Sequence, residues 1–175
     1  KFAQEWEVPN QFDSYQKLAQ STVVDAIYIA TPHSEHHDAT LLCLKNGKHV
    51  LCEKPLAVNA NQVLSMTQTA RAENQILMEG MWSRFPPLMR KVKDMVDSEM
   101  LGEIFSLQAD FGFLPKDSNP KNRLFNPDLA GGSLLDIGIY PLSFASMILG
   151  TPQRLTALAS IAKTNVDEQT SCILK

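Results

Sequence analysis

The run Asp25-Ala26-Ile27-Tyr28-Ile29-Ala30-Thr31-Pro32 decides the fold of the first half of the chain. Its mostly apolar, β-branched residues predict a short buried strand over 25–30, which Thr31-Pro32 ends. Further along, apolar spacing predicts helices and strands in alternation: a helix over 34–45, a strand over 49–52, a helix over 60–74 and a strand over 76–79. Connections this short predict right-handed crossovers between parallel strands.

Start and stop signals support these boundaries. Asn46-Gly47 is a stop signal for the helix over 34–45, and Asn59 is placed to cap the helix that follows. Nearer the start, Asp13 or Ser14 is placed to cap a short helix.

Polar or aromatic clusters follow each of the three predicted strands. They are Thr31-Pro32-His33, Glu53-Lys54-Pro55 and Gly80-Met81-Trp82. Because parallel sheets bind ligands beyond the carboxyl ends of their strands, the three clusters predict one binding rim.

After about residue 80 the pattern changes, which predicts a domain boundary. Pro86-Pro87 opens a predicted helix that runs to Ser98. Residues 103–113 alternate apolar and polar side chains, which predicts an antiparallel strand with one covered face. The rest of the chain reads as a polar loop over 114–130, a mostly buried helix over 133–149 and two strands over 154–163 and 167–175.

Composition disfavours several classes of function. The 175 residues, 44% of them hydrophobic, suffice for one large domain or two small ones. The net charge is −3, and no basic block points to nucleic acid or a membrane as a partner. No uninterrupted run of about 18 apolar residues is present to span a bilayer. The three cysteines lack metal-type spacing, which favours free, buried thiols in a reducing cytoplasm.

Lys54, Asp136 and Tyr140 are the first candidates for chemistry. Lys54 follows a parallel strand, where a ligand is expected, although a surface lysine in a loop is the alternative. Asp136 and Tyr140 are four residues apart in one predicted helix and so share a face. Tyr140 suits a general acid or base, and a nearby Lys54 ammonium would favour its phenolate form. For Asp136 the alternative role is a cap of the helix.

Two further groups are open to more than one interpretation. His33, His36 and His37 have metal-ligand spacing, but no Glu completes a His-Glu-x-x-His motif and no Cys is near, so no metal is expected. A histidine at this helix start is instead placed to touch a cofactor, or is simply solvated. Trp82 and Arg84 offer an aromatic wall and a cation for a sugar ring and a phosphate, with a core tryptophan as the alternative.

Four runs, in order, resemble the glucose–fructose oxidoreductase / inositol dehydrogenase family, and within it the dimeric dihydrodiol dehydrogenase (D-xylose 1-dehydrogenase) branch. They are residues 26–36, 47–55, 81–85 and 131–140, which read AIYIATPHSEH, GKHVLCEKP, MWSRF and GGSLLDIGIY. Each run alone is moderately specific, whereas four with family-like order and spacing are strong. The resemblance extends over essentially the whole chain.

The resemblance implies an α/β fold in two parts. Residues 1–80 would be the C-terminal part of a Rossmann dinucleotide-binding domain with a parallel sheet. Residues 81–175 would be the N-terminal part of a substrate and oligomerisation domain with an open, mostly antiparallel sheet. The implied activity is hydride transfer between NAD(P), with NADP slightly favoured, and a hydroxyl carbon of a sugar or trans-diol. A homodimer or higher oligomer would form through the C-terminal sheet.

The same resemblance assigns roles to single residues. Lys54 and the Asp136–Tyr140 pair match the catalytic positions, with Tyr140 taking a proton and Asp136 orienting Lys54 or the substrate. The cofactor contacts would be Ala30, Thr31, Pro32, His33, His36, Glu53, Lys54, Trp82 and Arg84. The substrate contacts would be Lys54, Trp82, Phe111, Asp136 and Tyr140. A non-catalytic sugar or nucleotide sensor of the same fold is the alternative, and a metal hydrolase using the histidines is a weaker one.

The sequence departs from the family in one respect. Gly-x-Gly-x-x-Gly, the turn that follows the first strand of a dinucleotide site, does not occur. We therefore expect this turn and the ribose-reading residue to lie upstream of Lys1, or else that the chain binds no dinucleotide.

Overall fold

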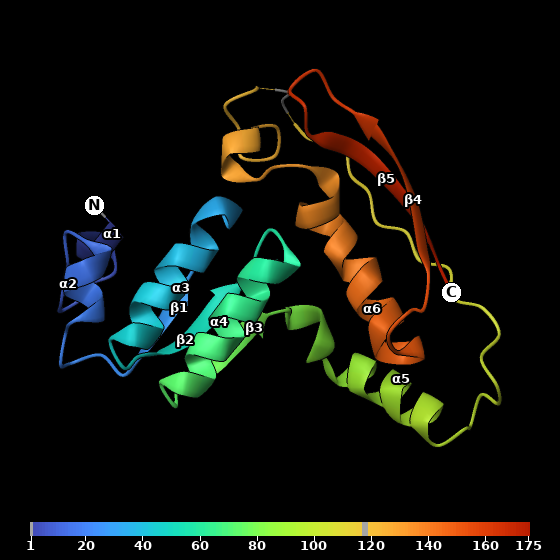
Figure 1. Cartoon of the computed structure of the whole chain (residues 1–175), viewed down its shortest axis with the longest axis horizontal. Helices are drawn as coiled ribbons and strands as arrows, with labels where there is room; N and C mark the ends of the chain where they lie inside the picture. Colours follow the sequence, from blue (N-terminus) through green and yellow to red (C-terminus); the bar gives the residue numbers. More distant parts are fainter. Residues whose placement is uncertain (1, 117–118) are drawn as a thin grey trace. The chain divides into compact units, whose positions relative to one another are not determined.

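The computed structural model describes residues 2–116 and 119–175, and its contacts divide the chain into two compact units (Figure 1). The first unit holds the chain up to Thr31 together with residues 35–79, and the second holds residues 32–34 and 80–175. Asp117 and Ser118, in the loop predicted over 114–130, lie outside the described residues.

The first unit is a three-stranded sheet with helices on one face. Its strands, in the order β1-β2-β3, are β1 (Ala26–Ile29), β2 (His49–Glu53) and β3 (Leu77–Gly80). β1 and β2 pair in parallel, with Ala26 opposite His49. The crossovers carry α3 (His36–Lys45) and α4 (Ala60–Ala72), which lie on the same face because crossovers between sequential parallel strands share one hand (Figure 1). The predicted α/β fold class is confirmed.

Two short helices, α1 (Phe2–Glu5) and α2 (Tyr15–Ala19), precede β1, and the 3-10 turn η1 (His33–Glu35) precedes α3. Capping fixes where the helices begin and end. Ser14 accepts a hydrogen bond from the first turn of α2, and Asn59 Oδ1 accepts one from Gln62 N at 3.0 Å at the start of α4. α3 ends before Gly47, whose φ of +73° is a left-handed conformation that favours glycine.

The core of the first unit lies between the sheet and its helices. It consists of Ala19, Ile27, Ile29, Ala39, Cys43, Leu44, Val50, Cys52 and Ala70. Alternate strand residues face the other way, and Tyr28 is 58% exposed. The prediction of a fully buried strand is therefore wrong for this face, because no element that the structure describes in this unit covers it.

The second unit combines helices with a two-stranded antiparallel sheet. Its elements are η2 (Trp82–Arg84), α5 (Pro87–Asp97), η3 (Pro127–Leu129), the π-helical turn η4 (Leu134–Gly138), α6 (Ile139–Leu149), β4 (Leu155–Ile161) and β5 (Asp167–Leu174). β4 and β5 form a hairpin with a register irregularity between Ser160 and Ile161. The helix predicted after residue 86 and the two predicted C-terminal strands are confirmed.

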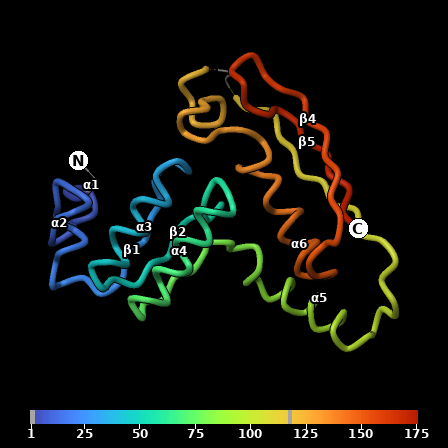
Figure 2. Tube along the Cα trace, in the orientation of Figure 1, coloured from blue at the N-terminus to red at the C-terminus, as the bar shows by residue number. Residues whose placement is uncertain are grey.

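Residues 103–113 do not form the predicted strand. They run as an extended segment without regular secondary structure (Figure 2), and Phe105 is 88% exposed. Alternation shows only that a segment is compatible with a sheet. A strand also needs a neighbour to satisfy its backbone groups, and in the described part of this unit β4 and β5 pair with each other.

The helix predicted over 133–149 differs from the prediction in two ways. It begins with the π-helical turn η4 rather than an α-helical turn, and Pro141 carries no N–H with which to make the α-type bond to the Ile137 carbonyl. Side chains of α6 are half-buried or exposed, with none fully buried. The prediction of a mostly buried helix is wrong because few described elements of the second unit pack on it.

One helical run in the described residues, Pro127–Leu149, is long and apolar enough to cross a membrane, with a mean hydropathy of 1.4. The sequence prediction counted only uninterrupted apolar residues, whereas an average tolerates the charge of Asp136. A single run of this kind is weak evidence of a membrane span, because the core helix of a soluble protein meets the same criterion.

The cysteines are free: Cys43 and Cys52 are buried, and Cys172 is half-exposed.

Candidate active site

In the first unit, Lys54 lies in the loop after β2, and hydrogen bonds of the residues on either side of it fix that loop. Tyr28 Oη donates a hydrogen bond of 2.5 Å to Glu53 Oε1, and Lys54 N donates one of 3.2 Å to Glu53 Oε2. Leu56 N donates to Glu79 Oε1 at 2.8 Å, which ties the loop to β3. The backbone around the half-buried Lys54 is therefore fixed by two carboxylates. The hydrogen bond to Glu53, with smaller contributions from burial and charge, raises the pKa of the Tyr28 phenol.

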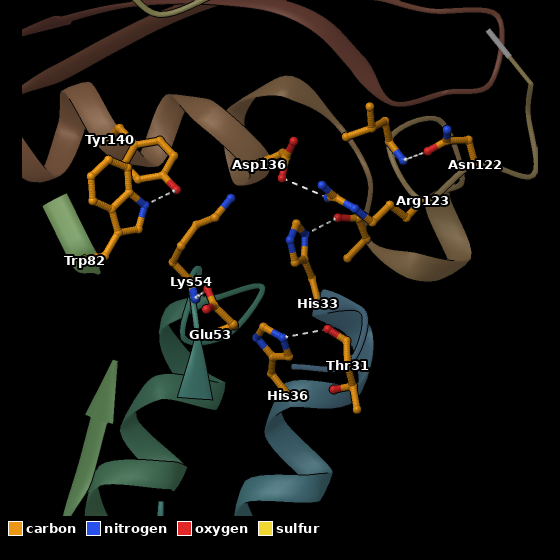
Figure 3. Close-up of polar contacts among 12 residues, drawn as sticks. Thr31, His33, His36, Glu53, Lys54, Trp82, Asn122, Arg123, Asp136 and Tyr140 are labelled. Carbon is orange, nitrogen blue, oxygen red and sulfur yellow. Dashed lines mark hydrogen bonds and ion pairs between the residues drawn. The ribbon is translucent and has the colours of Figure 1, made fainter. Parts of the chain in front are cut away.

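His36 is fully buried and joins the ends of two strands. Its Nε2 lies 3.1 Å from the Thr31 carbonyl oxygen (Figure 3), and its Nδ1 lies 2.8 Å from the Pro55 carbonyl oxygen. A carbonyl oxygen only accepts, so the imidazole is the donor where a bond forms. His36 thus links the chain segments that follow β1 and β2.

The rim also carries a hydroxyl without a protein partner. Thr31 Oγ1 is buried and has no hydrogen-bond partner among the described residues. Such a group at the carboxyl end of β1 is placed to donate to a polar ligand, because an unsatisfied buried hydroxyl is costly. Ala30 is exposed beside it, and Pro32 is half-exposed.

In the second unit, Tyr140 is the centre of an aromatic cluster. Trp82 Nε1 donates to Tyr140 Oη at 3.0 Å, and the two rings meet edge-on with centroids 5.9 Å apart (Figure 3). The Phe111 ring lies 5.6 Å from the Tyr140 ring, tilted by 58°. A mostly apolar pocket of about 240 Å³ opens beside Tyr140 and Phe111; Arg84, Met89, Phe144 and Met147 are among its other lining residues. The second unit therefore brings three of the predicted substrate contacts together.

Asp136 lies in the π-helical turn before Tyr140 and is 5% exposed. Arg123 Nη1 donates to Asp136 Oδ1 at 2.8 Å (Figure 3). Gly131 makes this approach possible, because a Cβ there would lie 2.6 Å from the Arg123 carbonyl oxygen. Sequence reasoning missed Arg123, which lies in an irregular loop with no periodic signal. A buried acidic residue in need of a cation was the one available clue.

The remaining predicted contacts have partners of their own. His33 Nδ1 lies 2.9 Å from the Ala130 carbonyl oxygen, and Arg84 Nε donates to Ser143 Oγ at 2.9 Å. His37, which was not a predicted contact but shares the metal-ligand spacing, has its Nδ1 2.7 Å from Asp38 Oδ1. Within the described ranges, no group of three histidine, cysteine or acidic side chains is placed to hold a metal ion.

Two family profiles match the chain. One, described as the oxidoreductase family with an NAD-binding Rossmann fold, matches residues 1–81, and the GFO/IDH/MocA C-terminal domain matches residues 89–175. The chain belongs to the GFO/IDH/MocA oxidoreductase family. Its membership confirms the resemblance drawn from the four sequence runs.

Two similar curated proteins carry the same name. Trans-1,2-dihydrobenzene-1,2-diol dehydrogenase of Mus musculus is 41% identical over 177 residues, which cover 100% of this chain and 52% of that protein. The enzyme of the same name from Xenopus tropicalis is 39% identical, over 99% of this chain and 52% of that protein. The chain thus spans about half the length of the curated relatives it matches.

Solved structures of the family are also similar to this chain. A 3-ketoreductase from Actinomadura kijaniata, in complex with NADP and TDP-benzene, has a TM-score of 0.89 and 31% identity, over 99% of this chain and 53% of that one. An aldose-aldose oxidoreductase from Caulobacter crescentus, complexed with glycerol, has a TM-score of 0.88 and 29% identity, over 98% of this chain and 54% of that one.

Proposed function

We propose that the native protein is an NAD(P)-dependent dehydrogenase that oxidises a hydroxyl carbon of a sugar or a trans-diol. The observation that carries this proposal is the Tyr140 hydroxyl, which accepts the Trp82 hydrogen bond beside a mostly apolar pocket. A tyrosine next to a pocket is suited, in its phenolate form, to take a proton from a substrate hydroxyl. The names of the curated dehydrogenases and of the sugar-acting solved enzymes agree with this reaction class.

In the proposed reaction, Tyr140 accepts the proton of the substrate hydroxyl as the carbon gives up a hydride. In the reverse reaction, where Tyr140 donates this proton to the carbonyl oxygen, the indole N–H of Trp82 stabilises the negative charge that develops on the Tyr140 oxygen. Lys54, by the family resemblance, contacts the nicotinamide ribose and the substrate hydroxyl. Asp136 orients Lys54 or the substrate, with Arg123 holding its carboxylate. The nicotinamide group, when bound, supplies the hydride acceptor.

The residues at the sheet rim fit a nicotinamide cofactor. The Thr31 hydroxyl, which has no partner among the residues that the structure describes, offers a donor. The half-buried Lys54 adds a cation in a loop fixed by hydrogen bonds. Ala30, Pro32, His33, His36, Glu53, Trp82 and Arg84 complete the proposed cofactor contacts. We propose NADP rather than NAD, in line with the NADP complex of the similar 3-ketoreductase.

Lys54→Met in the native full-length protein tests the assignment. We expect turnover, followed by the absorbance of reduced nicotinamide with a panel of pentoses, hexoses and diols, to fall at least about a hundredfold. Lys91→Met, at an exposed lysine of α5, is the matched control and should leave turnover unchanged. Retained turnover in Lys54→Met would remove Lys54 from the mechanism. Tight sugar binding without turnover in the unsubstituted protein would identify a sensor instead.

We also propose that two copies associate through the β4–β5 sheet. Its exposed face carries large apolar side chains, with Leu158 79% and Ile173 75% exposed. Apolar surface of this kind is typical of an obligate interface. Leu158→Lys should shift the native protein toward the monomer in analytical ultracentrifugation, and an unchanged mass would rule this interface out.

The buried free thiols Cys43 and Cys52 support a reducing, cytoplasmic location.

A further inference from the structure

The helix that carries Asp136 and Tyr140 begins without a cap of its own. Ser133 stands at the N-cap position, yet its side chain makes no capping hydrogen bond to the helix. Ser133 Oγ instead donates to Asp167 Oδ2 at 2.6 Å, and Leu134 N donates to the same oxygen at 2.7 Å. The N–H groups of a first turn need acceptors from outside the helix, and here a carboxylate distant in sequence supplies one.

Asp167 is itself held in place by the hairpin. It is the first residue of β5 and pairs with Ile161 across the register irregularity. Thr170 Oγ1 donates a third hydrogen bond to Asp167 Oδ2 at 2.9 Å. The preceding residue, Val166, is buried, which anchors the turn. The position of the carboxylate is therefore set by the sheet and not by the helix.

Gly132 provides an independent sign that this contact is built into the fold. A Cβ at Gly132 would lie 2.2 Å from Asp167 Oδ1, closer than real Cβ atoms approach an oxygen. Its φ of +112° is also a conformation that side chains other than hydrogen rarely adopt. Only glycine therefore lets the Asp167 carboxylate reach the Leu134 N–H.

We propose that Asp167 is a positioning residue, which caps the helix from the neighbouring sheet and thereby sets the orientation of Asp136 and Tyr140. The capped turn, η4, contains Asp136, and α6 starts one residue before Tyr140. A negative charge at a helix N-terminus is also favourable with the helix dipole. This inference rests on the proposed role of Tyr140 in proton transfer, since Asp167 itself touches neither substrate nor cofactor.

The test compares Asp167→Ala with a milder variant, Thr170→Val, in the native full-length protein. We expect Asp167→Ala to lower kcat about tenfold or more while the KM of the substrate changes little, because a small displacement of a reacting group is costly. Thr170→Val removes only the support of the carboxylate and should lower kcat less. Asp97→Asn, at an exposed carboxylate of α5, is the matched control and should leave kcat unchanged.

A double variant separates positioning from general stability. In the Tyr140→Phe background, Asp167→Ala should lower the residual kcat less than twofold, because both changes act through one hydroxyl. Equal loss in both backgrounds would overturn the proposal, as would an unchanged kcat in both Asp167→Ala and Thr170→Val.

Hydrogen exchange keeps this inference distinct from the proposed function. Amides of residues 133–140 should exchange faster in Asp167→Ala than in the unsubstituted protein, whether or not the protein turns over any diol or sugar. Unchanged exchange would refute the cap. Faster exchange in a protein with no dehydrogenase activity would uphold the cap and refute the proposed function.

Discussion

Trp82→Phe removes one hydrogen bond at Tyr140 and keeps the aromatic contact. The Trp82 N–H lies 3.0 Å from the Tyr140 oxygen, while the ring contact is edge-on at 5.9 Å and is available to a phenyl ring. Between neutral groups such a bond contributes about 1 kcal/mol, and less here because Trp82 is 62% exposed. In the reverse reaction, the reduction of a carbonyl, Tyr140 donates its proton and gains negative charge. The bond then becomes charge-assisted and is worth about 2 kcal/mol.

Only the difference between these two values affects the rate of the chemical step. That difference is about 1 kcal/mol, so we expect kcat for carbonyl reduction to fall about fivefold in Trp82→Phe, with little change in substrate KM. The assay is steady-state turnover of the native full-length protein in the direction of carbonyl reduction. The chain offers a matched control, Trp6→Phe, at the second tryptophan, which lies in the other unit.

The pattern of the kinetic constants decides between two roles for Trp82. A rise in KM with unchanged kcat would show that Trp82 is only an aromatic wall for the substrate, the role suggested by the sequence. An equal loss in Trp6→Phe would show that the effect is not specific to the Tyr140 hydrogen bond. Either result would refute the argument that the indole N–H stabilises charge on Tyr140.

Three further predictions concern single side chains. Burial raises the pKa of the Cys52 thiol from 9.0 to about 11, so the half-exposed Cys172 should be alkylated before Cys52. The free energy of unfolding should be constant below pH 9.0 and fall as the pH rises toward 11, and a rise in that free energy would contradict the prediction. Asn59→Ala removes the cap of α4 and should lower the free energy of unfolding by about 1 kcal/mol in a denaturant titration, whereas Asn59→Asp should not. Gly131→Ala places a Cβ 2.6 Å from the Arg123 carbonyl oxygen and should lower the free energy of unfolding by about 2 kcal/mol, which a lower melting temperature would show. An unchanged melting temperature would show that the loop moves to accept the Cβ without loss of stability.

The sheet of the first unit could be predicted because its signals are local. The run Ala26–Ile29 is β-branched and apolar, and Ser14 and Asn59 cap helices through hydrogen bonds to residues three positions away. Each signal acts within one turn or one strand, so it is present in the sequence itself. The exposed face of β1 at Tyr28 was not predicted, because the burial of a strand depends on which elements cover it.

The second unit was harder because its structure depends on distant partners. The alternation at 103–113 is compatible with a strand, but pairing depends on a neighbour that no local pattern specifies. The helical spacing of Asp136 and Tyr140 was visible, whereas the π-helical turn that contains Asp136 was not, because a few bonds shifted by one residue leave no periodic trace.

The structure also narrows the interpretation of Asp136. In the sequence, an acidic residue in the first turn of a helix is explained equally well by capping. The cap of this helix comes from Asp167, whose Oδ2 accepts from Leu134 N, while the Asp136 carboxylate accepts from Arg123. A carboxylate that is 5% exposed needs such a cation, since removing an unpaired charge from water costs far more than a helix cap gains. Capping therefore does not account for Asp136. Arg123→Met tests the remaining prediction, that Asp136 has an orienting role beside Tyr140. Loss of turnover while helix 139–149 stays protected in hydrogen exchange would support that role, and unchanged turnover would refute it.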